Sequence, residues 1–355
     1  MNKIKVSVII PIYNTEQYIE QCICSVLAQK LDDIEIICID DGSTDCSIDI
    51  IRKYASEDNR IIILQKENEG QSIARNAGMD ISHGEYIYFL DSDDFISDDA
   101  LQILYYEASK NNLDNIYFDA ESFFESDDLK KQHSSYINYY SRRSNYPEIV
   151  SGLELLQQME QNKDFRVSPC LQFFKKSFLL KNNLRFEENM IHEDDIFSLK
   201  VCLYAERSRH IPEKLYMRRI RENSTMTSSN CFQHSYGYLR CMICMLEELP
   251  KKEVEETYHT VLLKQLYSLQ SRAVKRITSV SNTDLNSFIG QIPFCEEVYY
   301  RLLIEKAAMT YREITALKKD TKQLKKRIHD LETSNSFRIG RIITYIPRKI
   351  KKLLK

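Results

Sequence analysis

The chain has 355 residues and a formal net charge of -3, enough for two modest domains or for one large domain with an appendage. A nearly neutral chain does not attract nucleic acid by charge, so we expect no nucleic-acid partner. The sequence begins with a strand-like segment and contains no stretch of about 18 uninterrupted apolar residues, so neither a cleaved signal peptide nor a transmembrane helix is expected. Ten cysteines without regular spacing indicate a reduced, cytoplasmic protein.

The first third of the chain alternates between short apolar runs and segments of helical periodicity. Strands are predicted at Lys5–Ile12, Ile34–Ile39, Arg60–Leu64, Tyr86–Leu90 and Asn115–Phe118. Helices are predicted at Glu16–Gln29, Asp45–Tyr54, Gln71–Ile81 and Leu101–Lys110, with Asn14 or Thr15 available to cap the first of them. Apolar strands that alternate with helices indicate an α/β fold, in which a mostly parallel sheet is flanked by helices.

The later two thirds of the chain become mainly helical. The polar and aromatic segment from about 120 to 147 is predicted to be a loop or an inserted hairpin, and helical patterns return at Gly152–Met159, at Asp195–Tyr204 and over 231–310. We therefore expect one half of an α/β domain at 1–120, a second half at 121–228, a helical region at 229–302, a possible coiled coil at 303–333 and a tail at 334–355.

Two features near the end of the sequence point to surface contacts. Apolar residues between Leu303 and Leu331 recur at alternating spacings of four and three, which fits either a homodimeric coiled coil over 303–331 or a solvated helix packed on its own domain. After Glu332 the chain has basic residues but no acidic ones, and residues 337–355 show a helical apolar period interrupted at Pro347. This tail is predicted to be a basic amphipathic helix at an anionic membrane surface; the alternative is a disordered basic tail.

Polar residues gather where the predicted strands end, and in parallel sheets ligands bind at that edge. Asp91, Ser92 and Asp93 directly follow the strand that ends at Leu90. Two carboxylates at this spacing can share a divalent cation with a diphosphate, and oxygen ligands suit Mn²⁺ or Mg²⁺. In isolation the same acidic residues could simply precede a helix N-terminus.

A second polar cluster, from Asp40 to Asp45, follows the strand that ends at Ile39. A carboxylate there can accept a hydrogen bond from a pyrimidine N3–H or a ribose hydroxyl, and Gly42 would permit a tight turn. The alternative is plain turn chemistry, with Thr44 or Asp45 as a helix cap.

Four segments resemble the glycosyltransferase family 2 pattern, in the same order and at its usual spacing. They are Val8–Asn14, Asp40–Asp45, Asn68–Gly78 and Gly84–Asp94. The resemblance covers the first hundred residues strongly and reaches the 220s more weakly. It implies the GT-A fold and inverting transfer of a sugar from a nucleoside-diphosphate sugar, with uracil as the expected base. It also implies that residues 1–120 form the nucleotide-sugar-binding half of this domain and residues 121–228 its acceptor-side half.

The resemblance also implies a role for individual residues. Pro11, Tyr13 and Asp41 match positions that hold the base, with Asp40 beside them. Arg75 matches a residue near the diphosphate. Asp91 matches the carboxylate on the ribose and metal side, and Asp93 matches the direct metal ligand.

Two later segments resemble further parts of the family pattern. His192-Glu193-Asp194-Asp195 is similar to its Glu-Asp motif, which makes Asp194 the candidate general base and Asp195 an alternative in register. Arg221 stands where many members carry His; a guanidinium can clamp diphosphate oxygens but cannot ligate a metal. Without the upstream motifs, these residues would be read as a charged helix N-terminus and a basic loop.

The predicted function is therefore a metal-dependent inverting glycosyltransferase, peripheral at the inner face of the cell membrane, that acts on a glycan or lipid-linked acceptor in surface polysaccharide synthesis. An alternative is a non-catalytic membrane-associated scaffold that retains a sugar-nucleotide site. An oxidoreductase or a nucleotidyltransferase is disfavoured because no glycine-rich loop follows the first strand.

Overall fold

A computed structural model describes residues 3–221, 231–277 and 319–327. The chain divides into two compact units, Met1–Ala273 and Val274–Lys355. In the second unit, the structure describes helix over 274–277 and 319–327. The predicted coiled coil lies largely, and the predicted tail entirely, outside the described residues.

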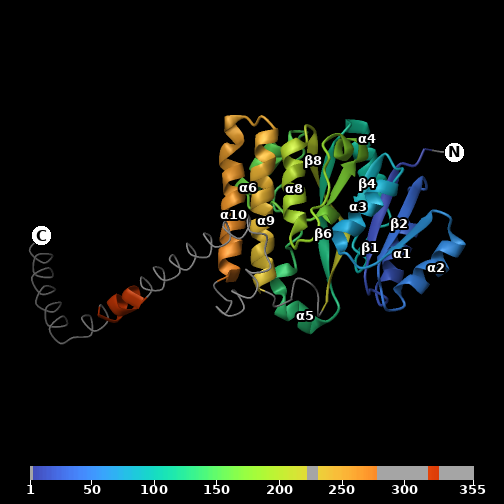
Figure 1. Ribbon diagram of the computed structural model, residues 1–355, viewed down its shortest axis with the longest axis horizontal. Helices are drawn as coiled ribbons and strands as arrows, with labels where there is room; N and C mark the ends of the chain where they lie inside the picture. Colours follow the sequence, from blue (N-terminus) through green and yellow to red (C-terminus); the bar gives the residue numbers. More distant parts are fainter. Residues whose placement is uncertain (1–2, 222–230, 278–318, 328–355) are drawn as a thin grey trace, which may run out of the picture. The chain divides into compact units, whose positions relative to one another are not determined.

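One mixed sheet forms the centre of the first unit, with its strands in the order β3-β2-β1-β4-β7-β6-β8-β5 (Figure 1). The strands are β1 (Val6–Ile12), β2 (Ile34–Asp41), β3 (Ile61–Lys66), β4 (Tyr86–Phe89), β5 (Phe95–Ile96), β6 (Asn115–Phe124), β7 (Gln172–Lys175) and β8 (Ser208–Ile220). Every residue of β2 is buried, as expected for a strand covered on both faces.

Helices connect and cover these strands. They are α1 (Ile19–Leu27), α2 (Ser47–Glu57), α3 (Gln71–Ile81), α4 (Ala100–Asn111), α5 (Asp127–Gln132), α6 (Gly152–Gln161), α7 (Lys176–Lys181), α8 (Glu193–Tyr204), α9 (Cys231–Glu248) and α10 (His259–Ile277). Short 3₁₀ turns lie at Ser134–Tyr136, Pro169–Leu171, Leu249–Lys251 and Glu256–Tyr258. In Figure 1, α6, α8, α9 and α10 stand side by side beyond the β6 and β8 part of the sheet.

The first half of the sheet matches the sequence-based prediction. β1 to β4 pair in parallel, and their bounds differ from the predicted ones by a few residues at most. The second half mixes directions, because β7 runs antiparallel to both β4 and β6 and β5 runs antiparallel to β8. The α/β prediction is confirmed, but the sheet is less parallel than expected.

One local expectation was wrong, and a second, the loop or hairpin over residues 120–147, holds only as a loop after Tyr136. The first helix begins at Ile19 and is not capped by Asn14 or Thr15. The side chain of Asn14 instead accepts a hydrogen bond from the Thr44 backbone at 2.8 Å, and Thr15 offers its carbonyl to the first helical turn. Residues 120–147 are not a hairpin: β6 runs on to Phe124 and is followed by α5 and a 3₁₀ turn.

Candidate active site

The acidic turn after β4 lies at the carboxyl edge of the sheet, as predicted. Oxygen atoms of Asp91, Asp93 and Asp94 lie within 4.8 Å of one another. The Asp94 amide donates to the Asp91 carbonyl at 3.1 Å, and this bond closes the turn. The sequence therefore brings three carboxylates together where a strand ends, one more than the two we singled out.

Asp94 is the structural member of this turn. Its side chain is fully buried and accepts from the Arg219 amide at 2.6 Å and from the hydroxyl of Tyr216. Both donors come from β8, so Asp94 fastens the turn to that strand. Burial raises the pKa of Asp94 to about 7, although Arg218 opposes the shift.

Arg75 of α3 joins the acidic turn to the start of α8. Its guanidinium contacts Asp91 at 2.9 Å, Asp194 at 3.0 Å and Glu193 at 3.2 Å. Its side chain is 2% exposed, and a buried cation needs such partners because their removal leaves an uncompensated charge. Burial opposes the charge, but Asp194, Asp91 and Glu193 hold the pKa of Arg75 above its ordinary value.

Two further arginines approach the same turn from the end of β8. Arg218 contacts Asp91 at 3.1 Å and Asp94 at 3.0 Å, and Arg221 contacts Asp93 at 2.9 Å. The structure thus places Arg221 beside the acidic turn. Sequence patterns singled out the segment of Arg218 but not Arg218 itself. Side chains alternate between the two faces of a strand, and which face Arg218 takes is determined by the pairing of β8 with β5 and β6. That pairing is not visible in the sequence.

The carboxylates of the turn differ in what surrounds them. Burial would raise the pKa of Asp91, but the guanidiniums of Arg75 and Arg218 hold it below its ordinary value. The side chains of Asp91 and Asp93 are 24% and 19% exposed, whereas that of Asp94 is not exposed at all. Asp91 and Asp93 therefore fit a hard divalent cation that also needs water or ligand oxygens, and Asp94 supports them.

Asp194 and Asp195 point to different partners. The Asp194 side chain lies on Arg75 and is 32% exposed, so a ligand can reach it. The surrounding protein still desolvates this carboxyl and raises its pKa. Asp195 is 8% exposed and pairs with Arg272 of α10 at 2.7 Å. Of the two candidates for the base, the structure brings Asp194 to the acidic turn.

The turn after β2 is built around Asp41. Its oxygens accept from the Lys66 side chain at 2.7 Å, the Glu69 amide at 3.0 Å and the Gly70 amide at 2.8 Å. These bonds fix the chain that enters α3, the helix that carries Arg75. Gly42 has φ +77°, as the predicted tight turn requires, and an added Cβ would meet the Asn68 amide at 2.8 Å.

The remaining predicted donor-side residues lie at the same edge. Asp40 is buried and accepts from the Ser43 amide at 3.0 Å and from Gln65 at 3.1 Å. Pro11 is half-buried near the end of β1, and Tyr13 beyond it is 51% exposed. An exposed ring of this kind is available for stacking, whereas Asp40 and Asp41 already have partners in their own turns.

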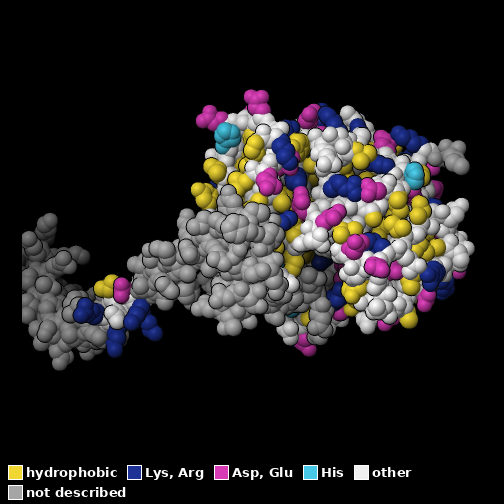
Figure 2. Space-filling view, in the orientation of Figure 1, with side chains coloured by type: hydrophobic (Ala, Val, Ile, Leu, Met, Phe, Trp, Pro, Cys, Tyr) yellow, Lys and Arg dark blue, Asp and Glu magenta, His cyan; other side chains and the backbone are white. Residues whose placement is uncertain are grey.

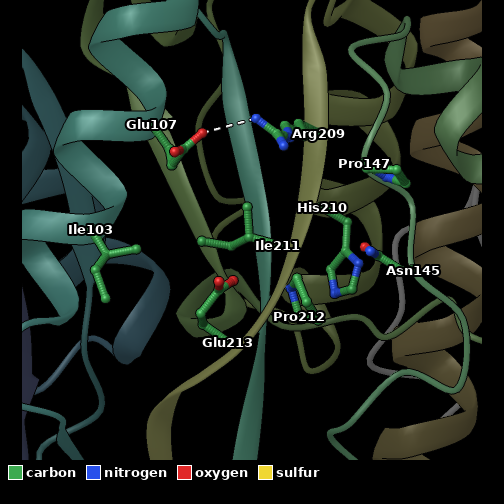
Figure 3. A pocket seen from close by; sticks show the side chains of 9 residues that line it. All are labelled: Ile103, Glu107, Asn145, Pro147, Arg209, His210, Ile211, Pro212 and Glu213. Atoms are coloured by element: carbon green, nitrogen blue, oxygen red, sulfur yellow. Dashed lines mark hydrogen bonds and ion pairs between the residues drawn. The ribbon is translucent and has the colours of Figure 1, made fainter.

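A cavity of about 140 Å³ lies elsewhere in the molecule. Figure 3 shows its lining, in which Glu107 and Arg209 form an ion pair of 2.9 Å. His210 and Glu213, at the start of β8, also line it. It shares no lining residue with the acidic turn, which contacts the other end of β8, so the two are separate.

The charge distribution on the described surface says little more about which ligands bind. Figure 2 shows Lys and Arg side chains interspersed with Asp and Glu over the described part of the face it draws. Among the described residues, no helix is both long and apolar enough to span a membrane.

Comparisons with known proteins bear on the family and the fold of the chain. Residues 7–181 match the model of glycosyl transferase family 2. The chain is 34% identical over 220 residues to glycosyltransferase GlyA of Streptococcus pneumoniae, covering 62% of this chain and 31% of GlyA. It is 35% identical over 222 residues to the uncharacterised glycosyltransferase EpsJ of Bacillus subtilis, covering 62% of each. The chain thus spans under two thirds of the length of these relatives.

Another relative is covered more fully, and solved structures share the fold. Glycosyltransferase GlyG of S. pneumoniae is 30% identical over 226 residues, which cover 62% of this chain and 72% of GlyG. S. aureus TarS 1-349 in complex with UDP-GlcNAc superposes with a TM-score of 0.67 at 22% identity, covering 87% of this chain and 92% of that structure. The chain has the GT-A fold and belongs to glycosyl transferase family 2.

Proposed function

We propose that the chain transfers a sugar, with inversion, from a UDP-sugar to a hydroxyl of a glycan or lipid-linked acceptor in surface polysaccharide synthesis. The observation that carries this proposal is the double contact of Arg75, which lies 2.9 Å from Asp91 and 3.0 Å from Asp194. One buried guanidinium thereby fixes the candidate base relative to the carboxylates of the donor side.

The proposed chemistry divides between the two sides of Arg75. Asp194 takes the proton from the acceptor hydroxyl, and the hydroxyl oxygen attacks the anomeric carbon. The bond between that carbon and the diphosphate oxygen breaks, so that UDP leaves with the bonding electrons. Asp91 and Asp93 would hold Mn²⁺ or Mg²⁺, which acts as a Lewis acid toward the departing diphosphate.

The other predicted residues complete the donor site in this proposal. Tyr13 and Pro11 lie against the base, with Asp40 and Asp41 shaping the turn beside it. Arg221 is 2.9 Å from Asp93 and 23% exposed, so it can exchange that carboxylate for a diphosphate oxygen when the donor arrives. The relatives support the class of reaction; PcManGT of Pyrobaculum calidifontis, with a TM-score of 0.54 at 13% identity, is solved in complex with GDP-Man and Mn2+.

Thermal unfolding in the presence of nucleotides tests the donor site. We would compare UDP, CDP, GDP, dTDP and their sugars, each with and without Mn²⁺. A ligand that binds only the folded state stabilises it by about 2.7 kcal/mol at 100 times its Kd. We expect manganese-dependent stabilisation by uridine nucleotides that is lost in Asp93→Ala. A folded protein that responds to no nucleotide would contradict the proposal and favour a scaffold.

A further inference from the structure

The start of α8 carries the candidate base, and a helical hairpin outside the family match covers it. The family model ends at residue 181, whereas α9 and α10 span Cys231–Glu248 and His259–Ile277. α9 packs along α8. Ser235 of α9 donates to the Ala273 carbonyl of α10 at 2.8 Å and thereby joins the two helices. The hairpin touches α8 at its first turn through two separate sets of contacts.

The first set of contacts surrounds His192, the residue before α8. His192 has φ +71°, which a residue with a side chain adopts only when its surroundings hold it there. Its ring stacks on Tyr238 at 3.8 Å between centroids and 8° between planes, and Nε2 lies 3.0 Å from Nδ1 of His234. Its carbonyl accepts from the Cys241 thiol at 3.1 Å. All three partners come from α9.

Gly237 makes this close approach of α9 possible. A Cβ at Gly237 would lie 2.2 Å from the carbonyl oxygen of Ile191. The helix backbone therefore rests directly on the chain that enters α8, with no room for a side chain.

The second set of contacts involves the carboxylate next to the base. Arg272 of α10 pairs with Asp195 at 2.7 Å, and its guanidinium also lies 4.5 Å from the centre of the Tyr238 ring. Arg272 therefore connects Asp195 to the side chain that stacks on His192. In the sequence, Asp194 lies between His192 and Asp195, which the hairpin holds in place. The carboxylate of Asp194 itself pairs with Arg75.

We propose that Arg272 and Tyr238 are positioning residues for the reaction: acting through Asp195 and His192, the α9–α10 hairpin sets the place of the Asp194 carboxylate. The inference rests on Asp194 being the base. A small misplacement of a catalytic group lowers the rate of the chemical step without removing ligand contacts. The contacts given above for Arg272 and Tyr238 run to Asp195 and to the His192 ring, so we expect their loss to leave donor binding intact.

The test compares Arg272→Met, Arg272→Lys and Tyr238→Leu in the full chain. The probe reaction is UDP release from UDP-GlcNAc and UDP-glucose, with n-octyl glycosides as acceptors. We expect kcat to fall by about 10- to 100-fold in Arg272→Met and Tyr238→Leu, with the donor KM and the donor Kd from calorimetry unchanged. Arg272→Lys keeps the charge beside Asp195 and should recover most of kcat.

Glu248→Gln is the matched control for a general loosening of the hairpin. Glu248 ties α9 to the other end of α8, through Tyr204 at 2.5 Å and Lys200 at 3.7 Å. We expect this variant to lower the melting temperature and leave kcat unchanged. Gly237→Ala, which forces α9 away from Ile191 without touching a charge, should lower kcat like Arg272→Met.

The outcomes separate this inference from the proposed function. Folded Arg272→Met and Tyr238→Leu proteins with wild-type kcat would overturn the positioning role, and so would a parallel loss of kcat and donor affinity. The assignment of Asp194 as base fails independently if Asp194→Asn retains wild-type transfer, because then no base needs positioning at this place. The proposed function itself fails if the folded wild-type protein transfers no sugar from any nucleotide-sugar donor.

Discussion

At the scale of single residues, the site depends on how buried charges are shared. Arg75, Arg218 and Arg221 supply three guanidiniums to Asp91, Asp93, Asp94, Glu193 and Asp194. Carboxylates outnumber guanidiniums, and such an excess of buried negative charge raises carboxyl pKa values wherever a partner is weak. The proposed divalent cation would balance part of this excess. The pKa of Asp91 is lowered whereas those of Asp94 and Asp194 are raised, so neighbouring carboxyl groups differ in how readily they ionise.

The variant Asp194→Asn tests the proposed base most directly. The amide keeps the shape of the side chain and a hydrogen-bond acceptor for Arg75, but it cannot take a proton from an acceptor hydroxyl. We expect transfer to fall by at least about 100-fold, the usual contribution of general base catalysis. Donor binding, measured by calorimetry with UDP and Mn²⁺, should be preserved. Loss of donor binding in this variant would reassign Asp194 to the donor site.

The raised pKa of Asp194 predicts the acid side of the pH profile. A base works only when deprotonated, and burial of the carboxyl raises the pKa of Asp194 above the ordinary value of about 3.9. As pH falls through this raised pKa, activity should be lost while the fold still holds. The profile of kcat/KM reports groups of the free enzyme, so it is the profile to measure. If kcat/KM fell only at or below pH 4, the assignment of Asp194 as the base would be contradicted.

At the scale of elements, long-range pairs decide where functional residues meet. One example is a buried cluster of charged side chains that joins the segment between β6 and α6 to the sheet. Asp119 of β6 binds Arg142 at 2.9 Å and His210 of β8 at 3.1 Å, and the Arg142 side chain is completely buried. This cluster fastens the end of the segment over 125–142 to the sheet, and so it supports β8, the strand that carries Arg218 and Arg219.

Asp119→Asn should destabilise the protein without changing its chemistry. The variant leaves the charge of Arg142 buried and uncompensated, which costs about 3–5 kcal/mol in free energy of unfolding. His210 and Arg142 hold the pKa of Asp119 below its ordinary value despite burial. The wild-type stabilisation is therefore present at neutral pH and is lost as pH falls through that lowered pKa. Urea unfolding at pH 7 measures the difference.

Asp128→Asn is the control for this prediction. Asp128 pairs with Lys131 at 3.1 Å, but both side chains are about four-fifths exposed, at 82% and 77%. An exposed pair of this kind contributes little to stability. If Asp119→Asn unfolded no more easily than Asp128→Asn, the anchoring role of the buried cluster would be wrong.

Sequence patterns predicted the elements that local information determines. The parallel strands β1 to β4 are short apolar runs with turn residues after them, so both the strands and their ends can be recognised in the sequence. β7 was missed because its four residues become a strand only by lying between β4 and β6. Asn14 was read as a helix cap because nothing local indicates that its side chain bonds to Thr44, thirty residues away.

The residues of the candidate site divide in the same way, into those that local sequence indicates and those that only long-range contacts reveal. Asp91, Asp93 and Asp194 could be proposed from the sequence because they stand in recognisable segments. Arg272 gave no signal: it is one basic residue on a long helix, and its partner Asp195 lies 77 positions earlier. Pairings of this kind become visible only when the helices α8, α9 and α10 are placed together.

At the scale of the whole molecule, the segment that matches the family is not the whole site. The match covers residues 7–181, and it includes the donor-side turns with Asp41 and Asp91. The proposed base and the arginines of β8 lie after it, within the same compact unit, Met1–Ala273. In the proposed function, donor recognition and acceptor activation would therefore come from different stretches of one unit, joined by Arg75.

The last prediction concerns the sequence beyond that unit, which we expect to attach the chain to a membrane. Residues 337–355 contain seven basic and no acidic residues. Each Lys or Arg near an anionic surface contributes about 1 kcal/mol, and salt screens this attraction. We expect the full chain to sediment with vesicles that contain phosphatidylglycerol and not with pure phosphatidylcholine vesicles. Truncation after residue 336 should abolish the sedimentation.

The same truncation separates the membrane role from catalysis. Since residues 337–355 lie outside the unit that holds the acidic turn, the shortened protein should transfer sugar to a water-soluble acceptor at the wild-type rate and lose rate only on vesicle-bound acceptors. Replacing Lys349, Lys351 and Lys352 with Gln keeps the apolar residues and should weaken sedimentation most at low salt. If the full chain ignored anionic vesicles at low salt, the tail would have another partner, and the proposed peripheral location would lose its only support in the sequence.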